Sequence, residues 1–567
     1  MSDSPDSLHT PVAVVGGDPA GLMLALFLDH HGVPSVVFDV CDPDGAPRNP
    51  PCATTQNART MEHYRRLGVS ASIRRLGLPC EHPTDIAFFT RYNGHELSRL
   101  PLPGTTQRLR RVAAAPRTDQ LPEPAHRVDD TRARAFLHDH VRTRPNITVM
   151  SGRTVTGVEQ DADRVRVRAE RPGHAREEWT ARYAVVSDAG RDLVHHTLGI
   201  RYERPGPLDR NSRGYGVTTA HLRLPGFHRD VLAGAPAWSH WVLNAELVAQ
   251  LVALGGADEF LFRVAGPADA GPLGEGRLTD VVRRAAGTAL PVEILGPCSW
   301  TPAAAYVAER FIRGRIFLMG DSAHPAGLYG DFMMNAGVDD AANLAWKLAA
   351  VLQGWGGPQL LASYEAERRP AAVRALAAAR ELDAELNAIT RPAALEACTA
   401  EGEAVRDRTG ALLRGFGEHT HAVGIQLGTR YDDSPVVASQ AQPPGDSWGT
   451  YVPTSVAGGR APHLWLDDWH GRGSSLFDRF GPCCSLLRLG PEPPSGKPLQ
   501  AAAQASGMPL TVLDVDGDAA RDLYERDLVL IRPDQHVAWR GNRWPTDPGD
   551  LVALVTGAGQ QWPGRRV

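Results

Sequence analysis

Hydrophobic and polar positions near the start of the chain follow the order strand, turn, helix, strand. The β-branched run at 11–15 predicts a strand, Gly16 and Gly17 interrupt it, and residues 19–31 have the period of a helix. A second apolar run at 35–38 predicts another strand. This βαβ order is how a dinucleotide-binding α/β domain begins, with the N-terminus of the helix facing a phosphate.

The middle of the chain predicts a second sheet and further helices. Residues 149–168 alternate as strands do, and residues 215–264 contain strand-like stretches rich in Val, Leu, Trp and Phe. Such a sheet is suited to lie over a ligand. A buried strand at 314–318 is followed by two stretches with helical character, 339–352 and 371–388.

Length, charge and cysteine usage exclude several classes of protein. A chain of 567 residues is too long for one core, so we expect two or three domains. The net charge is −5 and no basic block occurs, which argues against nucleic acid as a partner. The seven cysteines lack the spacing of a metal site or a disulfide framework. Reduced thiols predict a cytoplasmic protein without a bound metal.

Apolar run lengths bear on membrane association. No apolar run approaches the roughly 20 residues that a membrane helix needs. The polar and acidic residues 1–10 do not resemble a signal peptide. We therefore expect no membrane partner.

Three separated segments carry a resemblance to a known family. They are VAVVGGDPAGLMLALFLDHHGVPSVVFD (12–39), YAVVSDAGRDLVHHTLGI (183–200) and GRIFLMGDSAHPAGLYGDFMMNAGVDDAANLAWKL (314–348). Supporting stretches lie at 57–69, 430–435, 458–466 and 532–541. In order and spacing they resemble the phosphate-binding, middle and ribityl/flavin segments of FAD-dependent aromatic hydroxylases. The resemblance covers essentially the whole chain and is strongest to the polyketide-tailoring and phenol-hydroxylase branch.

The resemblance implies an α/β fold in three parts. These are a Rossmann-like FAD-binding domain of the glutathione-reductase type, an inserted β-sheet substrate domain and a C-terminal thioredoxin-like α/β domain. We assign residues 1–200 and 296–430 to the first, 201–295 to the second, 431–448 to a linker and 449–567 to the third. Family members use NAD(P)H, FAD and oxygen to hydroxylate an activated aromatic ring. The implied substrate is an aromatic polyketide, and a homodimer is one possible assembly.

Several positions keep the residue types that this resemblance expects for FAD. Gly16 and Gly21 belong to the phosphate loop, and Asp39 stands where an acidic residue binds the adenosine ribose. Asp188 lies in the middle segment. Asp321 and Asn335 belong to the ribityl/flavin segment.

Other positions depart from the family pattern and predict weakened FAD binding. Asp18 replaces the second glycine of the phosphate loop, and at about 4 Å and an effective dielectric near 20 its repulsion costs on the order of 4 kcal/mol per phosphate charge. Asp18 could instead simply cap the helix that begins at Pro19. Met333 and Met334 stand where the family places glycines against the flavin ring. We therefore expect no working cofactor, with FAD and NAD(P)H as the alternative.

An altered cleft of this kind could carry proton-transfer chemistry. Asp331 and Tyr329 replace non-ionisable residues of the family pattern, so they are candidate acid and base groups. His324 is a third candidate, although a structural role is the alternative. In the predicted substrate sheet, four residues could contact a planar ligand or simply pack in the core: Trp238, His240, Trp241 and Asn244.

Three functions remain open from the sequence. The first is a polyketide-tailoring enzyme that catalyses a non-redox reaction such as cyclisation, dehydration, ring opening or rearrangement. The second is a working FAD- and NAD(P)H-dependent hydroxylase or Baeyer–Villiger monooxygenase. The third is an inactive paralogue that binds a ligand or a partner enzyme.

Overall fold

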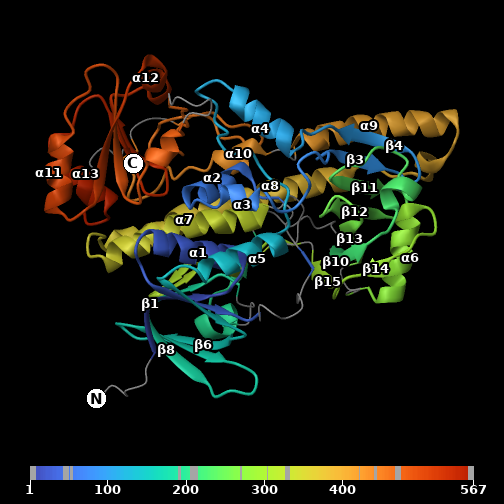
Figure 1. The fold of residues 1–567 in the computed structure, drawn as a ribbon, viewed down its shortest axis with the longest axis horizontal. Coiled ribbons are helices and arrows are strands. Elements are labelled where there is room, and N and C mark those ends of the chain that lie inside the picture. Colours follow the sequence, from blue (N-terminus) through green and yellow to red (C-terminus); the bar gives the residue numbers. More distant parts are fainter. Residues whose placement is uncertain are drawn as a thin grey trace.

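Two large sheets, a small C-terminal sheet and the long helices between them make up the chain (Figure 1). The computed structural model describes residues 8–41, 50–51, 55–188, 193–204, 215–267, 271, 273–302, 304–325, 332–419, 422–439, 443–466 and 474–559. This α/β architecture agrees with the predicted fold class.

The first sheet contains the predicted βαβ unit at its centre. Strands run in the order β17-β18-β8-β1-β2-β5, with β6 and β7 attached beside β8. Parallel pairing joins β1 to both β2 and β8, and the two faces of β1 are buried. The bounds are β1 Leu8–Val15, β2 Ser35–Asp39, β5 Ile147–Ser151, β6 Thr154–Gln160, β7 Val165–Glu170, β8 Glu177–Val186, β17 Ile312–Arg313 and β18 Ile316–Leu318.

The second sheet forms one wall of a large cavity. Its order is β14-β10-β13-β12-β11-β3-β4, with β15 beside β10. Strands β3 and β4 lie outside residues 201–295 in the chain. They join this sheet because β3 pairs in parallel with β11 and antiparallel with β4. The bounds are β3 Ile86–Phe89, β4 Glu96–Leu100, β10 Tyr215–Arg223, β11 Ser239–Leu243, β12 Val248–Ala253, β13 Glu259–Pro267, β14 Glu293–Ile294 and β15 Ser299–Pro302. A short ladder joins β9 (Tyr202–Glu203) to β16 (Val307–Ala308).

Helices α7 and α8 run side by side through the middle of the molecule (Figure 1). Helix α1 packs on α7 and on α5, which covers the first sheet. Near the start of the chain the helices are α1 Pro19–His30, α2 Ala58–Arg66, α3 Ser70–Ile73, α4 Thr105–Ala114 and α5 Asp130–Val141. The remainder up to residue 427 are α6 Glu275–Ala286, α7 Phe332–Leu352, α8 Pro358–Ala388, α9 Ala400–His419 and α10 Val423–Leu427.

The C-terminal part has its own mixed sheet, at the left of Figure 1. Its order is β20-β19-β21-β22, with one parallel and two antiparallel pairings. The bounds are β19 Cys484–Leu489, β20 Leu510–Val515, β21 Leu528–Ile531, β22 Val537–Gly541, α11 Lys497–Ala505, α12 Asp518–Tyr524 and α13 Pro548–Val555. This arrangement agrees with the thioredoxin-like domain of the predicted fold class.

The segment predicted as a linker, 431–448, packs against the rest of the chain at its start. Tyr431, Val436 and Ala438 are buried, and the Tyr431 ring lies 4.3 Å from the His536 ring. The C-terminal sheet is therefore attached through buried contacts. Among the helices described, none is both long enough and apolar enough to cross a membrane.

Candidate active site

Asp18 occupies the N-terminus of α1, where the strand β1 ends. Its Oδ2 accepts a hydrogen bond from the Ala20 N–H and its Oδ1 accepts one from the Gly21 N–H, each at 3.2 Å. The Ser187 hydroxyl donates to Oδ1 at 2.5 Å. Burial raises the pKa of Asp18. The carboxyl group is thus satisfied as a helix cap, which was the structural alternative for this residue.

The glycines of the phosphate loop are required by close packing around Asp18. Gly16 has φ of +128°, and a Cβ there would overlap the Ser187 hydroxyl. A Cβ on Gly21 would overlap the Gly16 carbonyl oxygen. Because glycine has no Cβ, the backbones of β1, α1 and the end of β8 can pack directly against one another.

Two more carboxyl groups share this region with Asp18. Asp188 follows β8, and Asp321 lies in a short 3₁₀ turn, Gly320–Ser322. Both residues are partly exposed to solvent, yet the surrounding protein desolvates their carboxyl groups. Burial, reinforced by the charge of Asp18, raises the pKa of Asp188 to about 8 and that of Asp321 to about 6. Three acidic groups therefore face one another near the helix N-terminus.

Arg134 supplies positive charge beside this acidic group. Its Nη2 lies 2.6 Å from Asp39 Oδ2, and its Nε donates to the Gly17 carbonyl at 2.6 Å. Asp39 also accepts a hydrogen bond from the Cys41 N–H at 2.9 Å. The charge of Arg134 lowers the pKa of both Asp18 and Asp188, although burial dominates each. Sequence reasoning missed Arg134 because it lies 95 residues from Asp39 in the chain.

Asn335 is held in the first turn of α7 by the N-terminal end of α2. Its Oδ1 accepts hydrogen bonds from the Asn57 N–H at 2.9 Å and the Thr60 hydroxyl at 2.7 Å. Its Nδ2 donates to the Thr55 carbonyl at 3.0 Å. Asn335 and Phe332 line a large cavity between α7 and the second sheet. The amide of Asn335 is therefore fixed at the wall of that cavity.

The two methionines after Phe332 lie elsewhere. Met333 is buried and belongs to the main hydrophobic core, and Met334 packs against that core. Neither lines the cavity. Their bulk is absorbed by the core, as the flexible methionine side chain allows.

The cavity has a volume of about 640 Å³ and mostly apolar walls. Its aromatic wall comprises Trp238, Trp241, Phe332 and Phe416. Trp241 makes an edge contact with Phe416 at 6.5 Å between ring centroids. A volume of this size, within the usual range for small-molecule sites, admits a planar ligand of several rings.

Only two of the four predicted substrate residues reach the cavity. Trp238 and Trp241 line it, whereas His240 is fully buried and its Nε2 accepts a hydrogen bond from the Ala237 N–H at 3.1 Å. Side chains alternate across a strand, so His240 points to the opposite face of β11 from Trp241. The buried Asn244 holds a turn, accepting hydrogen bonds from backbone N–H groups. Core packing, the alternative for these residues, accounts for His240 and Asn244, and a substrate contact for either stays a prediction.

The predicted catalytic residues divide between the core and the undescribed part of the chain. His324 is fully buried, and its Nε2 lies 2.7 Å from Asp340 Oδ2. Asp340 also accepts hydrogen bonds from Arg368 and from the Gly320 N–H. His324 therefore lies in the packing beneath the Gly320 turn. Tyr329 and Asp331 lie outside the described residues, and their roles stay predictions.

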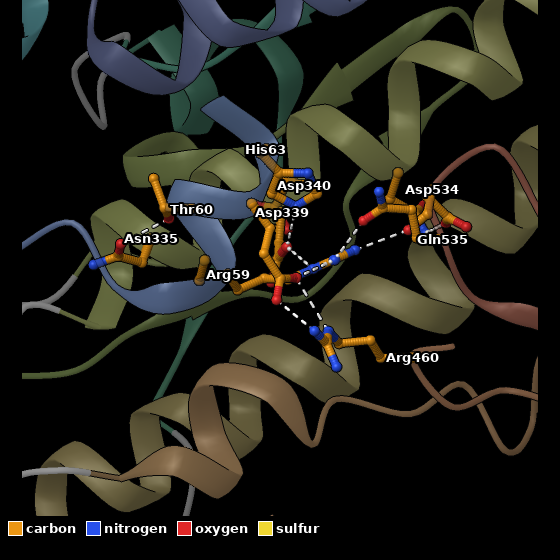
Figure 2. Close-up of polar contacts among 12 residues, drawn as sticks. Arg59, Thr60, His63, Asn335, Asp339, Asp340, Arg460, Asp534 and Gln535 are labelled. Carbon is orange, nitrogen blue, oxygen red and sulfur yellow. Dashed lines mark hydrogen bonds and ion pairs between the residues drawn. The ribbon is translucent and has the colours of Figure 1, made fainter. Parts of the chain in front are cut away.

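A buried polar network joins the cavity wall to the C-terminal domain (Figure 2). Arg59 on α2 donates to Gln535 Oε1 at 2.7 Å and to the Asp534 carbonyl at 2.9 Å. Glu62 on the same helix accepts from Arg59 at 2.8 Å and pairs with Arg460. In Figure 2, Asn335 and Thr60 lie at one side of Arg59 and Asp534 at the other. The N-terminal half of α2 is thus held on two sides, by Asn335 and by the C-terminal domain.

Comparison with known proteins identifies the scaffold. An FAD binding domain family matches residues 9–379, and an aromatic-ring hydroxylase C-terminal family matches residues 454–565. The chain belongs to the class A flavoprotein monooxygenases. Both the predicted family and the predicted fold class are confirmed.

The relatives match most of the length of this chain. The FAD-dependent monooxygenase opdD of Penicillium oxalicum is 31% identical over 86% of this chain and 95% of its own. Tetracenomycin B2 monooxygenase-dioxygenase of Streptomyces olivaceus is 28% identical over 96% of this chain and 97% of its own. The rebeccamycin biosynthetic enzyme RebC with reduced flavin is 31% identical, with a TM-score of 0.85 over 98% of this chain and 100% of RebC.

The prediction that no cofactor is bound is wrong. The FAD binding domain match and the flavin-bound RebC structure indicate FAD as the cofactor of this flavoprotein monooxygenase. The placement of the side chains that were expected to oppose FAD explains why this prediction was wrong. Asp18 caps its own helix with a carboxyl group whose pKa is raised by burial, Met333 lies in the core and Met334 packs against that core. Residue type alone did not reveal these placements.

The residues present fit FAD. Glycine packing brings the N-terminus of α1 close to the ends of β1 and β8, and Asp39 and Arg134 stand beside it. The raised pKa values of Asp18, Asp188 and Asp321 reduce the negative charge that a diphosphate would meet. Within the described ranges, no group of three or more His, Cys, Asp and Glu side chains is arranged to hold a metal ion.

Proposed function

We propose that the chain is an FAD- and NAD(P)H-dependent monooxygenase that hydroxylates a planar, multi-ring aromatic compound of the polyketide type. The observation that carries this proposal is the apolar cavity of about 640 Å³ that Asn335 and Phe332 help to line. It brings an aromatic-lined binding site to the segment that resembles a flavin-binding turn. The volume and the two tryptophans favour a fused-ring substrate over a single phenol ring.

In this proposal FAD, when bound, would supply the redox chemistry, which is the uptake of electrons from NAD(P)H and the activation of oxygen. Asp39 and Arg134 would hold its ribose and diphosphate, and Asp321 its ribityl chain. Asn335, fixed by three hydrogen bonds, would orient the ring system at the cavity wall. Trp238 and Trp241 would position the substrate face and exclude water from it.

Oxygen-isotope labelling tests the proposed reaction. FAD-loaded protein should oxidise NAD(P)H faster when a hydroxylated naphthoquinone or anthraquinone is added. Under ¹⁸O₂ the product should gain one labelled oxygen atom. Trp241→Leu should raise KM with little change in kcat, because it removes a stacking surface remote from the oxygen chemistry. Unstimulated NAD(P)H oxidation together with unlabelled product would contradict the proposal.

A further inference from the structure

Helix α4 lies at the upper edge of the molecule in Figure 1. It carries arginines that line the cavity. Arg108 and Arg111 lie one turn apart on α4 and line the cavity, and Arg127 and Arg263 line it from other segments. Asp119 is the acidic residue of this lining, and burial raises its pKa. The charged groups of the wall therefore carry a net positive charge.

Arg108 is distinguished by its surroundings. Its Nη1 donates to the Ala125 carbonyl and its Nη2 to the Thr84 hydroxyl, each at 2.8 Å. Both acceptors are neutral, and among the described residues no carboxylate forms an ion pair with Arg108. Burial, together with the charges of Arg74 and Arg111, lowers the pKa of Arg108 to about 10.

The carboxylate of Glu123 is already neutralised by other arginines. Glu123 pairs with Arg74 at 2.5 Å and with Arg65 at 3.1 Å, so it has two cations of its own. A guanidinium that is partly buried without a counter-ion is costly unless an anion reaches it. Five N–H donors less the two in use leave three on Arg108 for a ligand.

We propose that the cavity selects an aromatic substrate that carries a carboxylate, and that Arg108 is the residue that recognises it. The planar guanidinium fork matches a carboxylate, and the two neutral hydrogen bonds hold the fork at the cavity wall. The aromatic wall takes the rings, while Arg111 adds positive charge along the same side of α4. The inference rests on the proposed function only in taking this cavity as the substrate site.

A matched pair of probes tests the inference. Anthracene-9-carboxylate and its neutral amide have nearly the same shape, and their Kd values for the FAD-loaded protein can be measured by calorimetry. We expect the carboxylate to bind about tenfold or more tightly than the amide, as charge-assisted hydrogen bonds do. Arg108→Gln should lose this preference while leaving the Kd of the amide unchanged. Arg108→Lys should retain part of it.

Arg110 provides the control. It lies on α4 but is exposed and does not line the cavity, so Arg110→Gln should keep the preference. Equal Kd values for the two probes in the wild type, or a preference that survives Arg108→Gln, would overturn the inference. A carboxylate preference in a protein without oxygenase activity would contradict the proposed reaction and leave the recognition of carboxylates standing.

Discussion

Protonation of Asp18, Asp188 and Asp321 should control how well the site accepts a diphosphate. The pKa of Asp188 is raised to about 8 and that of Asp321 to about 6, so these two groups gain protons as the pH falls from 8.5 to 6, and burial also raises the pKa of Asp18. Repulsion of the diphosphate then weakens, so FAD affinity should rise on the order of tenfold over this range. Quenching of flavin fluorescence by the apoprotein measures this Kd. A Kd independent of pH would contradict the interpretation.

Variants of Asp18 separate its charge from its cap. Asp18→Asn keeps a helix-capping side chain but removes the charge, so FAD should bind more tightly and with a weaker pH dependence. Asp547 caps α13 in the C-terminal domain, which makes Asp547→Asn a matched control with unchanged FAD affinity.

The same pKa values give a sign for stability. A carboxyl group whose folded pKa is raised binds more protons when folded than when unfolded. Stability of the apoprotein from this source is full below the unfolded pKa of about 4 and is lost as the pH rises through about 6 and 8. Asp188→Asn should flatten this decline in Tm.

Helices α7 and α8 are joined to the C-terminal domain by one buried carboxylate. Glu367 accepts hydrogen bonds from Lys347 at 2.7 Å and from both terminal nitrogens of Arg532 at 2.6 and 2.8 Å. All three side chains are fully buried. Glu367→Gln removes the negative charge that Lys347 and Arg532 share in the core. It should therefore lower the free energy of unfolding by about 3–5 kcal/mol.

Urea-induced unfolding followed by circular dichroism measures the effect. Glu381 lies on the same helix but is exposed, so Glu381→Gln should change the free energy of unfolding by less than about 0.5 kcal/mol. A similar small effect for Glu367→Gln would show that the ionic network contributes little to stability.

Helices and strands with a clear hydrophobic period were predictable from the sequence. Contacts between residues far apart in the chain were not. The β1–α1–β2 unit follows from its own hydrophobic pattern. By contrast, α7 begins at Phe332, seven residues before the helical stretch predicted at 339, because its first turn is stabilised by contacts with α2. The Arg59–Gln535 hydrogen bond joins residues 476 apart. Local periodicity contains no information about such a pair.

The candidate site shows the same division. The positions of Gly16, Gly21 and Asp39 follow from the motif that contains them, and the structure brings them together with Asp188 at the first sheet. Arg134 and Arg108 belong to no motif. They reach the site because the fold places α5 and α4 there.

At the scale of the whole molecule, the C-terminal domain supports both walls of the active site. Through Arg59 it holds the helix α2 that positions Asn335. Through His463 and Trp465 it binds the cavity-side segment, since His463 Nδ1 lies 2.6 Å from the Asp119 carbonyl and the Trp465 N–H donates to the Arg117 carbonyl at 2.8 Å. The domain therefore shapes the cavity, although none of its described residues lines it. The expected homodimer stays a prediction.

Titration of the apoprotein with FAD tests whether this altered phosphate loop still binds the cofactor. We expect saturable quenching of flavin fluorescence with one FAD per chain, and tighter binding at pH 6 than at pH 8.5. Absence of saturable binding at pH 6, where protonated Asp188 opposes the diphosphate less than at pH 8.5, would contradict this expectation.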